Sequence, residues 1–310
     1  RPTCATGRTW SSLGANTIPV GAGTRETSRR RSRLTAAVDW ATRALSPRRP
    51  VAEVTESECR IVDLADVFDG YTVVALGDFH HRQPWTDVRW LRHAVDASND
   101  RGPDIVVLLG DYGSSFKRVR SLSRRWYRAG LAAMTPELVR LRATDGIFAV
   151  LGNHDYYAGA DLVRGWLSDI GAEVLVNESR HIVRAGQMLR LAGIDDVGEG
   201  SPDPWVGCDP SELSPTIALS HNPDAIERLD RRLRVDAMLA GHTHGGQIVL
   251  PWLGAPLTMS RVCKRTAAHG WIPNRRAPLY VTRGLGEQLP LPIRLGCRPE
   301  ILVLRLRAWG

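Results

Sequence analysis

The chain has 310 residues, of which 43% are hydrophobic and 24% charged, so it can bury a hydrophobic core. It contains no run of 18 apolar residues that would predict a membrane-spanning helix, and its five scattered cysteines exclude a disulfide framework or a Cys-type zinc site. The formal net charge of +8 favours anionic partners, although a basic surface without a specific partner would give the same value.

The N-terminal part, residues 1–57, is rich in Thr, Ser, Gly, Pro and Arg and is predicted to be a basic, weakly structured segment. Residues 28–33 contain paired arginines, as an export signal would, but the following residues 34–45 are too polar for the apolar core of a signal. Apolar residues near helical spacing predict a short amphipathic helix at 34–45. It could lie on an anionic membrane or dock on the folded domain.

The folded domain is expected to span residues 58–310, with strands and helices alternating in its first half. Strands are predicted at 59–64, 71–77, 105–109, 147–151, 216–219, 237–240, 279–282 and 301–306, and helices near 86–98, 160–169 and 223–231. Another helix is expected to begin at Thr135, because Pro136 follows a favourable N-cap residue. Short runs at 174–176, 181–184 and 189–194 predict antiparallel strands. This order predicts an α/β protein, a layered sandwich of two sheets with helices outside.

Five of the predicted strands end in polar residues that can bind metal ions or move protons. These residues are Asp78 and His80, Asp111, the run Asn153, His154 and Asp155, His221, and finally His242 and His244. A buried strand that ends at a tight turn brings such side chains to one edge of a sheet. The repetition therefore indicates one shared site.

The set combines carboxylates, imidazoles and one amide oxygen, a mixture that suits Mn, Fe, Zn or similar divalent ions. Six or seven such side chains exceed the three protein ligands that a single catalytic metal usually takes. They fit a pair of divalent metal ions bridged by a carboxylate. Such a pair activates hydroxide for in-line attack on phosphorus.

At these residues the sequence resembles the calcineurin-like metallophosphoesterases. The family's motifs D-x-H, G-D, G-N-H-[DE], a lone His and G-H-x-H all occur here in the family's order, between Asp78 and His244. Residues 244–247, 281–286 and 292–296 further resemble the bacterial branch that includes UDP-2,3-diacylglucosamine hydrolases and cell-envelope phosphodiesterases. The resemblance implies a four-layer α/β/β/α sandwich of two mixed sheets flanked by helices.

The resemblance also implies roles for the polar residues. Asp78, His80 and His244 would hold one metal, Asn153, His221 and His242 the other, and Asp111 would bridge both. His242 and His244 are two residues apart, so in an extended segment both would point to the same side.

His154 lies next to a ligand and is expected to stabilise the transferred phosphate or to protonate the leaving oxygen as a general acid. Asp155 is expected to orient His154 and keep it protonated. The alternative is that His154 is itself a metal ligand.

The substrate is expected to be a phosphodiester, a pyrophosphate or a phosphomonoester. Two segments that mix aromatic or apolar with basic residues, 117–128 and 251–275, suit a phospholipid or a nucleotide-sugar lipid and peripheral contact with an anionic membrane, or else simply pack over the sheet. The rival hypotheses are a nuclease or nucleic-acid-binding phosphoesterase, for which the sequence shows no specific nucleic-acid module, and a non-catalytic scaffold. The localisation is expected to be cytoplasmic or peripheral to a membrane. An exported form stays open, because the sequence starts at Arg1 rather than Met.

Overall fold

The computed structural model describes residues 51–81, 87–115, 120–209, 211–288 and 293–309, all within the unit Ser46–Gly310. The expectations for residues 1–50, including the amphipathic helix at 34–45, lie outside the described residues, as does part of the basic segment 117–128.

The first sheet contains six strands in the order β1-β12-β2-β3-β4-β5. They are β1 (Glu53–Val62), β2 (Thr72–Leu76), β3 (Ile105–Leu108), β4 (Ile147–Ala149), β5 (Ala172–Val174) and β12 (Glu300–Trp309). Strands β2 to β5 are mutually parallel, whereas β12 runs antiparallel to β2 and parallel to β1. The central strands β2 and β3 are fully buried apolar runs, as parallel strands covered on both faces are expected to be.

The second sheet also has six strands, in the order β10-β11-β9-β8-β7-β6. They are β6 (Glu178–Arg184), β7 (Gln187–Gly193), β8 (Thr216–Ser220), β9 (Ala237–Ala240), β10 (Gly270–Ile272) and β11 (Leu279–Val281). Strands β7, β8, β9 and β11 are parallel, and the edge strands β6 and β10 are antiparallel to their neighbours. Both sheets are therefore mixed, with a parallel centre.

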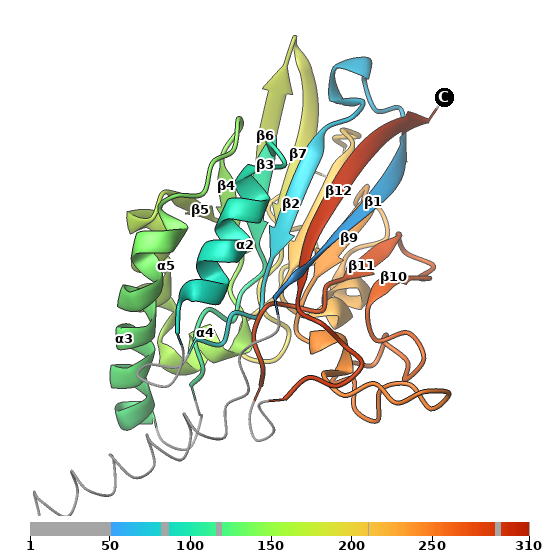
Figure 1. Ribbon diagram of the computed structural model, residues 1–310. Helices are drawn as coiled ribbons and strands as arrows, with labels where there is room; N and C mark the ends of the chain where they lie inside the picture. Colours follow the sequence, from blue (N-terminus) through green and yellow to red (C-terminus); the bar gives the residue numbers. More distant parts are fainter. Residues whose placement is uncertain (1–50, 82–86, 116–119, 210, 289–292, 310) are drawn as a thin grey trace, which may run out of the picture. The chain divides into compact units, whose positions relative to one another are not determined.

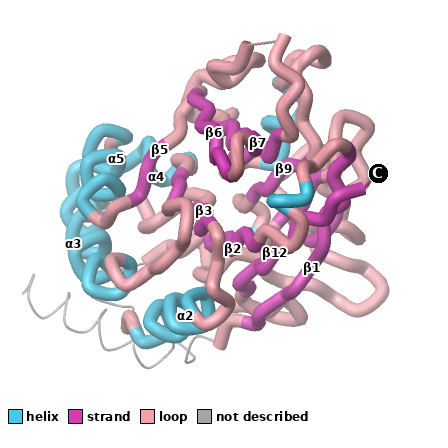
Figure 2. Tube along the Cα trace, turned by 90° about the horizontal axis from the view of Figure 1, so that it is seen from above, coloured by secondary structure: helices cyan, strands magenta, loops and turns pink. Residues whose placement is uncertain are grey.

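Helices cover the outer face of the first sheet (Figures 1 and 2). They are α2 (Arg89–Asn99), α3 (Arg120–Leu138), α4 (Asn153–Ala158) and α5 (Ala160–Asp169). The described residues also form three short 3-10 helices elsewhere in the fold: η1 (Asp66–Phe68), η3 (Pro223–Arg228) and η4 (His244–Gly246). The outer face of the second sheet is covered by η3 and loops, whose Ala225 and Ile226 join a core cluster with Ala218 of β8 and Met238 of β9.

Alternation along the strands separates the cores. In β2, Val74 and Leu76 belong to the cluster that the helices complete, whereas Val73 and Ala75 belong to the cluster between the two sheets. Successive side chains of a strand point to opposite faces, so one apolar run serves two cores. The architecture confirms the predicted α/β sandwich of two mixed sheets flanked by helices.

The helix expected to begin at Thr135 is wrong. The structure has one helix, α3, that begins at Arg120, and Pro136 lies in its last turn. The Thr135 hydroxyl donates to the carbonyl of Leu131 at 2.9 Å instead of capping a new helix. Residues upstream of Pro136 are mostly good helix formers, and a proline near the end of a helix removes only one backbone hydrogen bond.

Two strand predictions also change. Of the run expected at 174–176, only Val174 lies in a strand. It ends β5, which pairs in parallel with β4 in the first sheet, because α5 returns the chain as a β-α-β crossover. The first strand begins at Glu53, ahead of the expected domain start at residue 58, because β1 pairs with β12 along its whole length. Strands β6 and β7 confirm the antiparallel prediction.

None of the helices in the described part of the chain has the length and apolar character needed to cross a bilayer.

Candidate metal centre

The polar strand ends of both sheets meet at one edge of the sandwich. The turn after β2 pairs with the turn after β3, because the amide of Asp78 donates to Gly110 O at 3.0 Å and that of His80 to Asp111 O at 3.0 Å. The second sheet joins at the same place, where the amide of His242 donates to both carboxylate oxygens of Asp78 at 3.1 Å.

Five of these residues adopt left-handed backbone conformations: Asp78 (φ 52°), His80 (φ 41°), Asp111 (φ 55°), His242 (φ 71°) and His244 (φ 52°). Residues other than glycine are uncommon in this region, and such conformations persist only when the surrounding structure holds them. The segment from His242 to His244 is therefore not extended, which corrects the expectation for that pair. His244 instead opens η4.

The side chains approach one another closely. The Oδ2 atom of Asp111 lies 3.3 Å from Nε2 of His80 and 3.2 Å from Nε2 of His221. His244 Nε2 lies 3.0 Å from His80 Nε2 and 3.5 Å from Asp78 Oδ1.

Potential ligand atoms therefore gather in overlapping groups within 4.8 Å of one another. Three of these groups are Asp78–His80–His244, His80–Asp111–His154 and Asp78–Asp111–His221, all buried, and each could hold a metal ion.

Two histidines present ring nitrogens suited to a cation. Nδ1 of His221 faces the carbonyl of Leu109 at 2.8 Å, and Nδ1 of His244 faces that of Gly286 at 3.3 Å. A carbonyl oxygen can only accept, so the neutral form of each ring carries its hydrogen on Nδ1. This leaves Nε2 as the ligand atom, as is usual for histidines that bind metals.

Electrostatics point the same way. Burial lowers the pKa of His80 and of His244 well below the usual value, so two neutral rings face each other. Burial, together with the nearby His221, also lowers the pKa of His242 to about 4. Burial raises the pKa of the Asp78 carboxyl to about 7. A cation among these groups would relieve the cost of burying carboxylates and would bind the facing lone pairs.

The remaining predicted ligands are also at this edge. Asn153 is the first residue of α4, and its Oδ1 is a buried atom that accepts no hydrogen bond. His242 Nδ1 lies 3.1 Å from His221 Nε2. A buried amide oxygen without a partner is costly, so Asn153 fits a metal ligand on the chemistry of its own side chain.

Gly152 allows the loop before α4 to approach Asp111. A Cβ atom at position 152 would lie 2.3 Å from Asp111 Oδ1, a distance that real contacts do not allow. The amide of the neighbouring His154 donates to the same oxygen at 2.9 Å. The glycine is therefore required for this contact between the β3 and β4 strand ends.

The expected contact between Asp155 and the His154 ring is absent from the structure. The buried Asp155 carboxylate accepts hydrogen bonds from the amides of Asp111 (2.9 Å), Tyr112 (3.1 Å) and Gly152 (2.7 Å), and from the Tyr127 hydroxyl. Both residues lie in the first turn of α4, where consecutive side chains diverge by about 100°. Asp155 thus fixes the backbone under the site and does not orient His154.

The His154 ring is oriented by residues that the sequence did not single out. Its Nδ1 lies 2.8 Å from Ser115 O, and its Nε2 lies 3.5 Å from Nε2 of Gln288. The Ser115 hydroxyl also bonds to the carbonyl of His154. No local signal marks these partners, because they come from loops far away in the chain.

Arg294 supports His244 from beneath. Its half-buried guanidinium donates to His244 O at 3.3 Å, Arg283 O at 2.7 Å and Gly284 O at 3.2 Å, and also bonds to Gly286 O. It therefore ties together the loops that carry the carbonyl facing His244 Nδ1.

The fold and this cluster define a two-sheet α/β protein with a His–Asp metal centre at the carboxyl edge of its parallel strands. Residues 71–246 match the model of the calcineurin-like phosphoesterase family. The chain belongs to this family, and it is a metal-dependent phosphoric ester hydrolase.

Relatives support the assignment. The chain is 30% identical to the phosphodiesterase YaeI of Escherichia coli, over 76% of this chain and 82% of that protein. It is 30% identical to the metallophosphoesterase YkuE of Bacillus subtilis, over 83% and 86%. A transmembrane protein with metallophosphoesterase domain from Danio rerio is 30% identical over 82% of this chain, which spans 57% of that longer protein.

Among solved structures, a dimetal phosphatase from Danio rerio aligns with 70% of this chain and 88% of its own, at 14% identity and a TM-score of 0.43.

Proposed function

We propose that the chain hydrolyses a phosphodiester with two divalent metal ions. One observation carries the proposal: a single oxygen of Asp111 lies within 3.3 Å of His80 and 3.2 Å of His221, at the boundary between two groups of ligand atoms. A carboxylate in that position suits a bridge between two cations.

In this proposal Asp78, His80 and His244 hold one metal, and Asn153, His221 and His242 hold the other. Burial alone would raise the pKa of Asp111, but the neighbouring His221 and His154 hold it well below the usual value, so Asp111 is charged and ready to bind. Bound metal ions would polarise the phosphate oxygens and activate the attacking water.

His154 acts on the substrate side of the centre. Its Nδ1 is engaged with Ser115 O, so Nε2 is the atom that can reach a phosphate oxygen or donate a proton to the leaving group. The grouping of His154 with His80 and Asp111 also allows it to ligate a metal. The variant His154→Gln separates the two roles, because loss of a ligand lowers metal content and loss of a proton donor lowers turnover alone.

The choice of a diester is supported by the E. coli relative, whose name is phosphodiesterase. The test is to load the purified chain with Mn²⁺ and to compare bis-p-nitrophenyl phosphate with p-nitrophenyl phosphate, nucleoside pyrophosphates and a UDP-sugar lipid. Preference for the diester is expected. Preference for the nucleoside pyrophosphates or for the UDP-sugar lipid, which both contain a pyrophosphate bond, would show that the pyrophosphate is the substrate class instead. Hydrolysis of the monoester alone would contradict the proposal that the substrate is a diester. A chain with full metal content that hydrolyses none of these compounds would contradict the proposed hydrolysis.

We also propose that the enzyme works at the surface of an anionic membrane, either in the cytoplasm or on an exported form. The apolar and basic composition of residues 251–275 supports this contact.

A further inference from the structure

We infer that a rim of exposed apolar side chains beside the metal centre inserts into the surface of an anionic lipid bilayer. This apolar rim consists of Trp252, Leu253, Leu257, Met259, Ile293 and Leu295. The inference rests on the proposed membrane contact and assigns it a surface, but it does not depend on which phosphate ester is cleaved.

The apolar rim lies at the same edge as the metal ligands. Leu295 pairs with the segment that follows η4, since the amide of Val249 donates to Leu295 O at 2.8 Å and that of Leu295 to Gln247 O at 3.0 Å. Gly246 packs so tightly on Ala255 that a Cβ atom at position 246 would lie 2.2 Å from the Ala255 Cβ. The rim loops therefore continue directly from His244.

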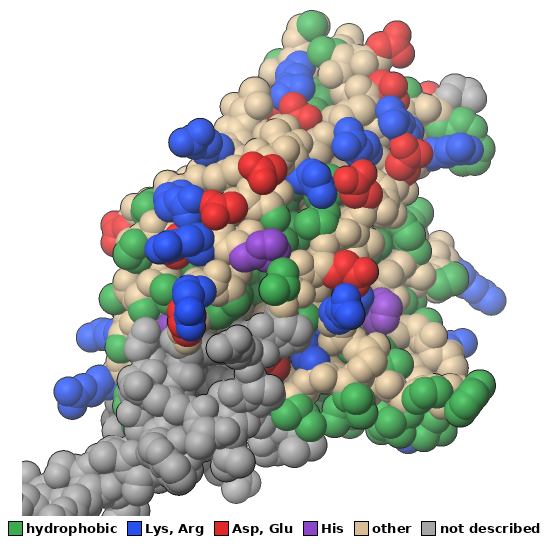
Figure 3. Space-filling model, viewed as in Figure 1, with side chains coloured by type: hydrophobic (Ala, Val, Ile, Leu, Met, Phe, Trp, Pro, Cys, Tyr) green, Lys and Arg blue, Asp and Glu red, His purple; other side chains and the backbone are tan. Residues whose placement is uncertain are grey.

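Figure 3 shows hydrophobic side chains gathered over these loops at the lower right, below β10 and β11 in Figure 1. A substrate embedded in a membrane would then approach from the side on which the metal ligands lie.

The backbone holds the rim side chains outward. Trp252 is fully exposed at 102%, and it adopts a left-handed conformation with φ 61°. Met259, at 53% exposure, has φ 54°. A bulky residue in this region is strained, and strain of this kind points to a function for the conformation. In water, the exposed Trp252 ring makes no contact that would offset the cost of this conformation. At a bilayer interface, where tryptophan rings are favourably placed, such a contact would form.

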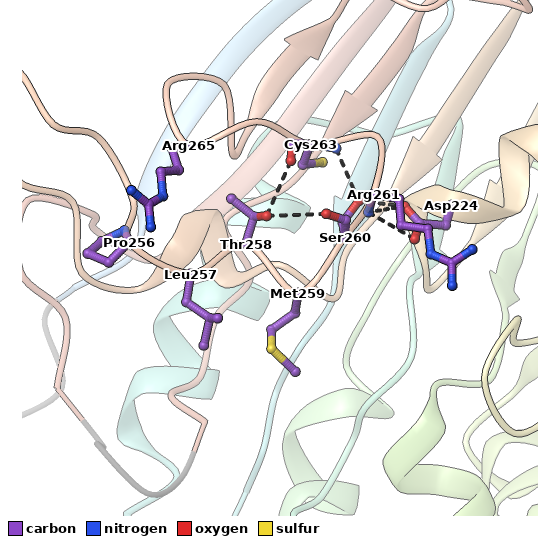
Figure 4. Close-up of a pocket in the computed structure, with 9 residues that line it drawn as sticks. All are labelled: Asp224, Pro256, Leu257, Thr258, Met259, Ser260, Arg261, Cys263 and Arg265. Carbon is purple, nitrogen blue, oxygen red and sulfur yellow. Dashed lines mark hydrogen bonds between the residues drawn. The ribbon is translucent and has the colours of Figure 1, made fainter.

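The loop behind the rim is fixed by hydrogen bonds. The Asp224 carboxylate accepts from the Ser260 hydroxyl at 2.6 Å and from the amide of Arg261 at 2.9 Å, and the Thr258 hydroxyl donates to Cys263 O at 3.2 Å. Leu257 and Met259 then extend to one side of the loop, beside an open hollow of about 470 Å³ (Figure 4). A rigid loop loses little conformational entropy when it binds.

The charge around the rim selects an anionic partner. Residues 247–275 contain no Asp or Glu, and their cations are Arg261, Lys264, Arg265 and Arg275, all of which are exposed. Tryptophan and aliphatic side chains bordered by Lys and Arg match the chemistry of a bilayer interface with anionic headgroups. A second copy of the chain docked through the same face would set these cations against their own copies, which disfavours a symmetric dimer.

Vesicle co-sedimentation of the full chain tests the inference, with phosphatidylglycerol–phosphatidylcholine vesicles compared with pure phosphatidylcholine at about 0.15 M salt. The double variant Trp252→Ser with Leu253→Ser is expected to bind the anionic vesicles at least about tenfold more weakly than the unchanged chain. The matched control changes Trp309→Ser with Leu213→Ser, an exposed Trp and Leu that lie outside the rim.

Charge is tested by Lys264→Ala with Arg265→Ala. Arg265 lines the hollow, and the exposed Lys264 precedes it in the chain. This pair is expected to weaken binding to anionic vesicles and to leave the weaker binding to neutral vesicles unchanged.

The outcomes separate the explanations. Equal loss in the rim variant and in the control, or full binding by the rim variant, would overturn the assignment of this surface. A chain that shows no vesicle binding but forms a dimer lost in the rim variant would make the rim a contact between copies. Failure of the membrane inference leaves hydrolysis of a soluble diester intact, and failure of the proposed reaction leaves vesicle binding intact, so the two can be told apart.

Discussion

The metal centre and the apolar rim lie at the same edge of the sandwich but are built in opposite ways. The centre buries charged and polar groups that a cation would compensate, whereas the rim exposes apolar groups that the proposed bilayer would cover. Both use strained left-handed residues, His242 and His244 in one case and Trp252 in the other. In both regions the free chain carries a cost that binding would remove: a cation would remove it at the centre and, in our proposal, a lipid surface would remove it at the rim.

The largest effect is expected at the residue that the two ligand groups share. Replacing Asp111 by Asn removes the charge that sits between His80 and His221, so bound metal and hydrolysis of bis-p-nitrophenyl phosphate should both fall to background. Elemental analysis and the rate are measured together. Asp169→Asn, at the exposed end of α5, is the matched control, and full activity in Asp111→Asn would contradict the proposed bridge.

Replacing His154 by Gln is expected to lower turnover by about 100-fold or more, because the proton donor is lost, with metal content close to that of the unchanged chain. His181→Gln, which alters a surface pair with Glu212, should leave the rate unchanged. Parallel loss of metal and rate in His154→Gln would show that His154 is a ligand.

Metal affinity is expected to depend on pH through Asp78. Burial raises the pKa of this carboxyl to about 7 in the metal-free chain, so below that pH a metal must displace its proton. Apparent affinity should therefore fall by at least about tenfold for each pH unit below 7. Burial alone would lower the pKa of the proposed ligand His221, but the neighbouring Asp111 raises it well above its usual value, so a metal must displace that proton as well. Competition with a chelator, corrected for the chelator's own protonation, measures this slope. A flat profile between pH 5 and 7 would contradict the role of Asp78.

A smaller effect is expected from Tyr127→Phe. The change removes one donor to the buried Asp155 carboxylate and leaves the three amide donors in place. Burial raises the pKa of Asp155 to about 7, so the carboxylate is charged at about pH 8. At that pH, loss of one hydrogen bond to it should lower the free energy of unfolding by about 2 kcal/mol. Denaturant titration of the metal-loaded chain measures this free energy. A variant that loses bound metal while its free energy of unfolding stays unchanged would mean that Asp155 acts on the ligands directly.

The smallest effect on hydrolysis of a soluble substrate is expected from changes in the apolar rim. The rim variant Trp252→Ser with Leu253→Ser should hydrolyse a soluble diester at the unchanged rate, because neither residue contributes to the ligand groups. The same variant should lose activity on a diester presented in anionic vesicles. A fall on the soluble substrate would show that the rim also shapes the metal centre.

Much of this organisation could be predicted from sequence because it is local. Buried apolar runs that end in Gly–Asp or Gly–His predicted the strands β2, β3 and β9 and the residues at their ends. The partners of those residues could not be predicted in the same way. Ser115 and Gln288 reach His154 from loops that are adjacent only after folding, and Asp155 diverges from its neighbour because α4 begins at Asn153.

The sequence by itself determined the two-sheet sandwich, the family and the set of polar residues at the strand ends, because each depends on short-range pattern and order along the chain. Only the tertiary structure decided which of these residues face one another. It showed that Asp111 lies between His80 and His221, that Asp155 holds backbone amides rather than the His154 ring, and that an apolar rim borders the centre. These are contacts between segments far apart in sequence, and packing of the two sheets sets them.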